Sequence, residues 1–325
     1  MTAVALYTVL GEGFDPYYNL ALEEYLLSRV PDSGCILYLW QNDHTVVIGR
    51  NQNPWVECRT SLLQEEKGHL ARRLSGGGAV YHDLGNLNFT FLCREEHYDL
   101  QKQLSVIQRA VKLAGIDAYF SGRNDLLAEG RKFSGNAFYH KKGTAYHHGT
   151  LLVHSDFARL QRYLSPPKAK LESKGIASVR SRVVNLTELS PALTISDMKD
   201  YMLHSFAQVY GEDPKSLFLS QDDKAVILKL RQRYASEDWL FSKPMPFSCT
   251  IEGHFSFGNL QLMLSVEAGI INGVQVYTDA MDAELSQKLA VCLTGCPFQT
   301  DPITQAVSAL DVGTELAEFI HTQQL

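Results

Sequence analysis

The chain has 325 residues, of which 45% are hydrophobic and 20% charged, which is the composition of a globular protein large enough for two domains. No apolar run reaches the roughly 18 residues that a membrane-spanning helix needs. The six scattered cysteines form neither a disulfide framework nor paired metal-binding motifs, and the net charge of −6 argues against a general nucleic-acid binder. The start of the chain lacks a basic, signal-like segment, so we expect a cytoplasmic protein.

The charge is unevenly distributed. Residues 121–182 contain 12 Lys/Arg against 4 Asp/Glu, a local balance of +8 that leaves −14 for the rest of the chain. Such a stretch is either a solvated basic surface or a positive field around a site for an anionic ligand or an acidic partner. Charge does not decide between the two.

The first part of the chain predicts a capped helix and two strands. Asp15-Pro16 followed by residues 17–29 is typical of a helix, because aspartate caps a helix start and proline fits the first turn. Residues 37–40 and 45–48 are rich in apolar and β-branched side chains and predict two strands joined by the polar turn 41–44.

The middle of the chain predicts further strands and helices. A hairpin is expected around Lys141-Lys142-Gly143, because a short polar turn with glycine separates two strand-like runs. The other predicted elements are a strand at 87–92, a helix at 104–114 stopped by Gly115, hairpin strands at 131–140 and 144–154, and a helix at 196–210 ending at Gly211.

A change of pattern near residues 241–246, which hold two prolines within three positions, favours a linker. The elements expected beyond it are strands at 249–257, 260–267 and 270–278, with turns at Gly258-Asn259 and Ala268-Gly269, and helical segments at 282–293 and 303–322. We therefore expect an α+β fold, with a large domain over residues 1–243 and a small α/β domain over 247–325.

The first chemical signal is RRLSGGGAVYHD, residues 72–83, followed by Gly85-Asn86. Successive glycines let the backbone approach a ligand, and their N–H groups can surround phosphate or carboxylate oxygens. A plain glycine turn is the alternative, but the paired arginines before the glycines and His82-Asp83 after them favour a ligand loop. It is neither a Walker loop nor a Rossmann fingerprint.

The second signal combines GRND, residues 122–125, with RKFSGNA, residues 131–137. On a regular strand Lys132, Ser134 and Asn136 would share one face, with Phe133 and Ala137 on the other. A lysine among small polar neighbours suits the neutralisation of an anion in a cleft. An exposed lysine on an edge strand is the alternative.

Two further segments belong with these signals. The adjacent His147 and His148 on a strand would point to opposite faces, which argues against a two-histidine metal site and predicts one structural and one cleft-lining ring. Residues 174–186, with a glycine and alternating basic side chains, fit either a mobile loop that closes over an anion or a basic surface loop.

In this order, RRLSGGGAVYHDLGN, GRND, RKFSGNA, HHGTLL and KGIASVRSRVVNLTEL closely resemble the lipoate–protein ligase A family. The upstream segment WQNDHTVVIGRNQNPWVEC supports the resemblance, and residues 247–298 are similar to that family's accessory C-terminal domain. The resemblance implies a biotin/lipoyl-ligase-like fold, a mixed sheet with flanking helices, with the catalytic domain over residues 1–243.

The resemblance also implies a two-step reaction. Lipoate attacks ATP, in complex with Mg²⁺, to give lipoyl-AMP and pyrophosphate, and a carrier lysine then takes the lipoyl group and releases AMP. The implied partners are lipoyl domains of 2-oxoacid dehydrogenase acyltransferase subunits and the glycine-cleavage H protein. The sequence leaves the oligomeric state open and does not argue strongly against a monomer.

The resemblance assigns roles to particular residues. Lys132 matches the family's essential lysine, which contacts both the lipoyl carbonyl and the phosphate. Asn124 and Asp125 would lie near the adenylate or its metal, and Ser75 and His148 would join Lys132 around lipoate. The residues expected around ATP or lipoyl-AMP are Arg73, Ser75, Gly77, Gly78, Ala79, Val80, Tyr81, His82, Asn86, Asn124, Asp125 and Lys132.

Three alternatives stay open at this point. A thioester-forming transferase of the same fold lacks its nucleophile, because no cysteine occurs between Cys93 and Cys249, and Cys93 itself is expected to be a buried apolar residue. A transferase that uses preformed lipoyl-AMP is disfavoured by the GRND segment and the C-terminal domain. A lipoyl-adenylate sensor without turnover is disfavoured by Lys132.

Overall fold

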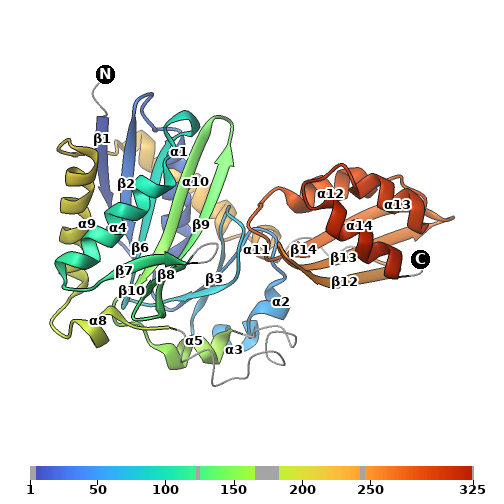
Figure 1. Cartoon of the computed structure of the whole chain (residues 1–325), viewed down its shortest axis with the longest axis horizontal. Coiled ribbons are helices and arrows are strands. Elements are labelled where there is room, and N and C mark those ends of the chain that lie inside the picture. Colours follow the sequence, from blue (N-terminus) through green and yellow to red (C-terminus); the bar gives the residue numbers. More distant parts are fainter. Residues whose placement is uncertain (1–4, 122–124, 165–182, 242–245, 324–325) are drawn as a thin grey trace. The chain divides into compact units, whose positions relative to one another are not determined.

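The structure is a computed structural model that describes residues 5–121, 125–164, 183–241 and 246–323 (Figure 1). The chain divides into two compact units. The first unit comprises Met1–Val47, Trp55–Arg72 and Val80–Leu240, and the second comprises Ile48–Pro54, Arg73–Ala79 and Phe241–Leu325. Two short segments from the first quarter of the sequence therefore pack with the C-terminal residues, a grouping that a single boundary near residue 243 does not anticipate.

The first unit is built on an eight-stranded mixed sheet in the order β11-β1-β2-β6-β10-β9-β8-β7. β1 is parallel to β2 and to β11, and the other pairings are antiparallel. The strands are β1 (Ala5–Leu10), β2 (Gly34–Trp40), β6 (Asn86–Arg94), β7 (Ala118–Ser121), β8 (Asp125–Ala128), β9 (Arg131–Lys141), β10 (Thr144–Leu152) and β11 (Lys215–Ser216). The expected α+β class with a mixed sheet is confirmed.

A smaller sheet of three strands has the order β4-β3-β5. Its members are β4 (His69–Arg72), β3 (Thr45–Ile48) and β5 (Val80–His82). The two strands predicted at 37–40 and 45–48 therefore both form, but they enter different sheets instead of pairing with each other. The polar turn between them carries the chain from one sheet to the other.

Helices cover both faces of the large sheet. α4 (Leu100–Leu113) and α9 (Ile195–Tyr210) pack against each other on one face, as Figure 1 shows, and share one apolar core with Leu87, Phe89 and Phe91 of β6. α1 (Pro16–Leu27) lies on the other face, where it is joined by α10 (Gln221–Tyr234).

Local signals set several element ends as expected. The Asp15 side chain accepts hydrogen bonds from the backbone of Tyr17 and Tyr18, which caps α1, and α9 ends at Gly211 in the left-handed conformation. The β9–β10 hairpin turns through Lys142 and Gly143, both at positive φ, as a two-residue turn requires. The remaining helices of this region are α2 (Pro54–Glu57), α3 (Thr60–Glu65), η1 (Glu95–His97), α5 (Phe157–Tyr163), α8 (Leu186–Leu189) and α11 (Glu237–Phe241).

The second unit contains an antiparallel meander backed by helices around its own apolar core. Its elements are β12 (Cys249–Phe255), β13 (Gly258–Glu267), β14 (Ile270–Thr278), α12 (Leu285–Leu293), α13 (Thr300–Val307) and α14 (Gly313–Thr322). The helical segment predicted at 303–322 is therefore two helices. The chain turns tightly between them, because Gly313 lies so close that a Cβ there would be 2.3 Å from the carbonyl oxygen of Val307.

Within the described ranges, we find no helix that combines the length and apolar character needed to cross a membrane.

Candidate active site

A β-bulge decides where Lys132 points. β8 and β9 pair in register at Asp125 with Gly135 and at Leu126 with Ser134, but the next pair is Leu127 with Lys132. Phe133 is therefore an extra residue on β9, and its fully buried ring packs into the core with α4 and α9. Because paired residues share a face, Lys132 lies on the face of Asp125 and Gly135.

This corrects the expectation that Lys132, Ser134 and Asn136 share one face. Ser134 is paired with Leu126, whose side chain is in the core beside α4, and the Asn136 side chain bonds to His147 on that same side. The regular alternation of side chains fails at this point because the bulge shifts Lys132 by one position.

Lys132 forms an ion pair with Asp125, with 2.6 Å between Nζ and Oδ1. Both side chains are about one-third exposed, at 33% and 37%, so the pair lies at the surface of the sheet and not in the core. Two of the predicted site residues are thus brought together. Asn124, predicted to lie beside them, falls outside the described residues, as does most of the predicted loop 174–186.

His147 belongs to the core, as expected for one of the two adjacent histidines. Its ring is packed between Phe89, Phe91 and Phe138, with Nδ1 3.1 Å from the Gln103 amide and Nε2 2.8 Å from the Asn136 amide. Burial lowers the pKa of His147 to about 3, so the ring is neutral and has one N–H. One of the two amides must then present its NH₂ group to the ring.

His148 points to the opposite face, as the strand period requires. Its Nδ1 lies 2.8 Å from Glu23 Oε1, and both side chains are almost completely buried. Thr90 Oγ1 donates to the same carboxylate at 2.7 Å and accepts from Trp40 Nε1 at 3.1 Å. A buried chain of hydrogen bonds therefore connects α1, β10, β6 and β2.

Glu23, Thr90 and Trp40 are not among the site residues predicted from the sequence. Glu23 could have been recognised as a carboxylate on a helix whose neighbouring residues are mostly apolar. Such a group is buried only together with hydrogen-bonding or charged partners. Thr90 was visible in the alternation of β6, where it follows Asn86 and Asn88 at every second position.

His82 joins a second buried polar group on the same unit. Its Nδ1 lies 3.2 Å from the Asn42 amide, Asn42 accepts from Asn19 at 3.0 Å, and the Tyr38 hydroxyl donates to Asn19 at 3.1 Å. The Trp40 ring stands edge-on to His82, with 6.1 Å between ring centroids. Trp40 is therefore the side chain common to the surroundings of His82 and of His148.

The other predicted residues of the first unit lie nearby in the chain. Val80 and Tyr81 are on β5 beside His82, and burial raises the pKa of Tyr81 to about 12. Asn86, at the start of β6, donates to Asn88 Oδ1 at 2.9 Å.

The glycine-rich loop belongs to the second unit, where Arg73 organises it. The buried Arg73 guanidinium donates to Ser75 Oγ at 3.0 Å and to the carbonyl oxygens of Gly76 and Gly78 at 2.7 and 2.8 Å. These bonds fix the curvature of the loop from within.

The three glycines of this loop meet different surroundings. A Cβ on Gly76 would be 2.2 Å from the carbonyl oxygen of Ala280, and the backbone N–H of Gly77, at φ +86°, donates to that same oxygen at 3.0 Å. A Cβ on Gly78 would meet no atom of the described residues within 4 Å, and Ala79 follows it. Gly76 is therefore required by packing, whereas no described atom crowds the side-chain position of Gly78.

The sequence predicts a metal ion only near Asp125, where it would accompany the adenylate. Among the residues that the structure describes, no group of three or more His, Cys, Asp or Glu side chains is arranged to hold an ion. The Asp125 carboxylate itself is paired with Lys132.

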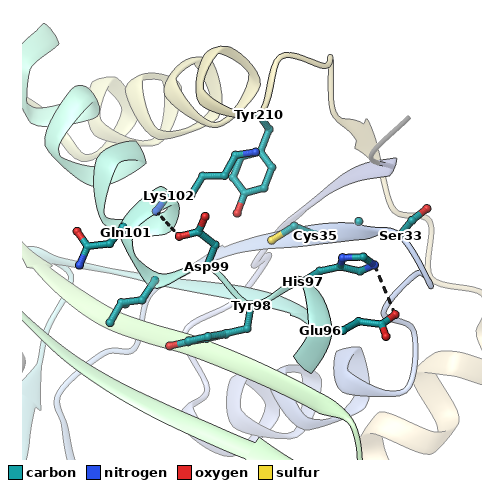
Figure 2. Close-up of a pocket in the computed structure, with 11 residues that line it drawn as sticks. Ser33, Cys35, Glu96, His97, Tyr98, Asp99, Gln101, Lys102 and Tyr210 are labelled. Atoms are coloured by element: carbon teal, nitrogen blue, oxygen red, sulfur yellow. Dashed lines mark hydrogen bonds and ion pairs between the residues drawn. The ribbon is translucent and has the colours of Figure 1, made fainter. Parts of the chain in front are cut away.

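A separate cavity of about 690 Å³ lies where β2 begins, beside the first turn of α4 and the last of α9 (Figure 2). The Tyr210 hydroxyl points toward Cys35 there, and the Lys102 ammonium lies 4.3 Å from the Tyr210 ring centre. None of the predicted site residues lines this cavity. Cys35 is opposite Cys93 in the sheet, and both are buried, as expected for Cys93.

Comparisons with known proteins place this geometry in a family. Residues 15–207 match the lipoyl protein ligase A/B catalytic domain, and residues 245–325 match the bacterial lipoate protein ligase C-terminus. P. falciparum LipL1, solved in complex with lipoate, is 27% identical with a TM-score of 0.86, over 97% of this chain and 99% of that one. A bipartite lipoate protein ligase from Thermoplasma acidophilum, described with its E2 lipoyl domain, is 25% identical with a TM-score of 0.67, over 75% and 98%.

A third structure, a lipoate-protein ligase A bound with ATP, has a TM-score of 0.63 at 24% identity, over 74% of this chain and 98% of that one. At that identity the likeness concerns the fold.

Proposed function

This chain belongs to the lipoyl protein ligase A/B family, and on that premise we propose that it activates lipoate with ATP and transfers the lipoyl group to a lysine of a carrier domain. The observation that carries the proposal is the placement of Lys132. A β-bulge turns this lysine out of the core and sets its ammonium beside Asp125, on the sheet face that also carries His148.

In the proposed first step, a lipoate carboxylate oxygen attacks the α-phosphorus of ATP. An O–P bond forms, the bond between the α-phosphorus and the oxygen that bridges to the β-phosphate breaks, and pyrophosphate leaves. Attack by one anion on another requires fixed positive charge. At 4 Å and an effective dielectric near 20, one lysine–phosphate pair is worth about 4 kcal/mol before desolvation. Lys132 supplies that charge, with the anionic substrates competing against Asp125 for its ammonium.

Mg²⁺ enters this proposal as part of the substrate, bound to the phosphates of ATP. Its role would be to neutralise the phosphate charge while pyrophosphate leaves. Asp125, and Asn124 beside it in the sequence, are the proposed neighbours of the adenylate or its metal.

We assign the glycine-rich loop to the nucleotide. Arg73 holds the loop from within. We propose that backbone N–H groups beside Gly78, where no described atom crowds the side-chain position, bind phosphate oxygens. The residues proposed to contact ATP or lipoyl-AMP beside Lys132 and Asp125 are Arg73, Ser75, Gly77, Gly78, Ala79, Val80, Tyr81, His82 and Asn86.

His148 is the proposed contact for lipoate, together with Ser75 and Lys132. Its ring is held rigidly by Glu23, which in turn is fixed by Thr90. A rigid, buried wall of this kind suits a site that must hold an apolar acyl chain in one orientation.

In the proposed second step, the ε-amine of the carrier lysine attacks the carbonyl carbon of lipoyl-AMP. A C–N bond forms and the amine nitrogen loses a proton to solvent, while the bond between the carbonyl carbon and the phosphate oxygen breaks and AMP leaves. Negative charge develops on the carbonyl oxygen, where Lys132 can stabilise it. Lipoyl domains of 2-oxoacid dehydrogenase acyltransferase subunits and the glycine-cleavage H protein are the proposed carriers. The E2 lipoyl domain described with the T. acidophilum ligase supports the first of these.

We also propose that the enzyme works as a monomer in the cytoplasm, where its six free cysteines would stay reduced.

The test is lipoate-dependent release of pyrophosphate from MgATP by the purified protein, without any carrier. Release together with lipoyl-AMP formation is the expected result. Absence of release, combined with transfer from supplied lipoyl-AMP to an apo lipoyl domain, would instead identify a transferase that depends on another enzyme for activation. Tight binding of lipoyl-AMP with neither activity would identify a sensor.

A further inference from the structure

Gly135 lies three residues after Lys132 on β9 and on the same face of the sheet. A Cβ built on Gly135 would be 2.9 Å from Lys132 Nζ and 3.0 Å from Lys132 Cε. The lysine side chain therefore runs along the strand and over the bare backbone of Gly135 before its ammonium reaches Asp125.

We propose that Gly135 is a positioning residue for Lys132, because its missing side chain leaves the channel in which the lysine lies. The inference rests on the proposed function, in which the Lys132 ammonium is the fixed charge at the reacting groups. It concerns the space at Gly135 and not its backbone angles, since Gly135 is not among the glycines with positive φ.

The backbone around this channel has little freedom to make room for a larger residue. The carbonyl oxygen of Lys132 accepts a hydrogen bond from the N–H of Val184 at 2.9 Å, on the edge of β9 that does not pair with β8. The N–H of Gly135 donates to Thr150 Oγ1 at 3.2 Å, and a Cβ on Gly149 would be 2.6 Å from the carbonyl oxygen of Gly135.

Among the residues that the structure describes, a methyl group at position 135 thus conflicts with one flexible side chain only. The next atom, Thr150 Oγ1, would be 3.9 Å from the Cβ, an ordinary contact distance. The protein can accommodate alanine by moving the end of Lys132, at low cost in stability. The consequence is a displaced ammonium in a folded protein.

The experiment compares Gly135→Ala with Gly13→Ala, a matched substitution at an exposed position where a Cβ would meet no atom of the described part of the chain within 4 Å. A crystal structure of Gly135→Ala is expected to show Lys132 Nζ no longer within 4 Å of Asp125. Misplacement of a catalytic group by about 1 Å typically costs about 100-fold in rate. We expect a loss of that order in kcat for pyrophosphate release, with the KM for lipoate and the unfolding temperature close to those of the Gly13→Ala protein.

A double-mutant cycle separates positioning from a general structural effect. If Gly135 acts through Lys132, then Gly135→Ala adds no further loss to a Lys132→Ala protein. Additive losses, or an intact Lys132–Asp125 pair in the Gly135→Ala crystal, would overturn the inference. If the wild-type protein released no pyrophosphate, the proposed function would fail, but the crystal structure would still decide the position of the lysine.

Discussion

The two faces of the large sheet differ in kind along the same three strands. On the α4/α9 face, β6, β10 and β9 contribute Phe89, Phe91 and Phe133 to a closed apolar core, and even the polar His147 is held there in its neutral form. On the opposite face the same strands contribute Thr90, His148 and Lys132, each bonded to a charged partner. Strand alternation, together with the bulge that brings Lys132 to this face, thus separates the supporting structure from the candidate chemistry by the thickness of one sheet.

Residues that are neighbours in the sequence can therefore have unrelated roles in the structure. Lys132 and Phe133 are adjacent, as are His147 and His148, yet one of each pair is buried beside α4 and the other faces the site. Substitutions on the two faces should therefore affect different measurable quantities. Four predictions, from the largest expected effect to the smallest, can break or sharpen that separation.

Lys132→Ala should lower pyrophosphate release by several orders of magnitude while the protein stays folded, because it removes the fixed charge on the site face without touching the core. Steady-state kinetics and far-UV circular dichroism would measure the two effects. Lys141→Ala is the matched control, since Lys141 is an exposed residue of the same strand. Near-normal release by Lys132→Ala would contradict the role we propose for this lysine.

Phe133→Ala should instead reduce the free energy of unfolding by about 3–5 kcal/mol, the usual cost of deleting a fully buried aromatic ring. Urea unfolding would measure this loss. Phe218→Ala, at a position 82% exposed, should cost far less. Equal losses in both variants would mean that the bulge does not direct Phe133 into the core.

His147 should make stability dependent on pH. Because burial lowers its pKa from 6.5 to about 3, the unfolded chain binds a proton between these values that the folded protein does not. The contribution of the neutral His147 ring to the free energy of unfolding is complete above pH 6.5. It is lost as the pH falls toward 3, by up to about 1.4 kcal/mol per pH unit.

Urea unfolding of the wild type and of His147→Gln from pH 7.5 to pH 4.5 would measure this contribution. The variant should show a shallower decline than the wild type. Parallel curves for wild type and His147→Gln would refute the buried neutral ring.

The smallest expected effect concerns the excess of positive charge over residues 121–182. If this stretch attracts acidic carriers, transfer to an apo lipoyl domain should slow several-fold as sodium chloride rises, because salt screens exposed charges beyond about 10 Å at 0.1 M. Lys141→Glu should slow transfer and leave carrier-free pyrophosphate release unchanged. A transfer rate that changes with neither salt nor this substitution would contradict the proposed attraction of acidic carriers.

Much of this arrangement could be predicted from residue patterns. The alternation in β6, the Asp15 cap and the Lys142-Gly143 turn are local signals, and each gave the expected element. The opposite orientation of His147 and His148 follows from the two-residue period of a strand and was also predictable.

What could not be predicted depends on pairing between distant segments. The bulge at Phe133 exists only relative to β8, so the face of Lys132 could not be read from β9 itself. The bond between Glu23 and His148 joins residues 125 positions apart. Likewise, nothing local to Gly76 indicates that the carbonyl oxygen of Ala280 occupies the space of its missing side chain.

If the glycine loop contacts the nucleotide as we propose, its unequal surroundings bear on how the substrate range can be changed by directed evolution. A library that randomises position 76 would consist mainly of members that cannot pack, since any side chain there collides with the Ala280 carbonyl. Position 78 carries no such steric cost within its unit. Variants at position 78 are therefore expected to fold, so they can be selected for the use of new nucleotides or acyl chains.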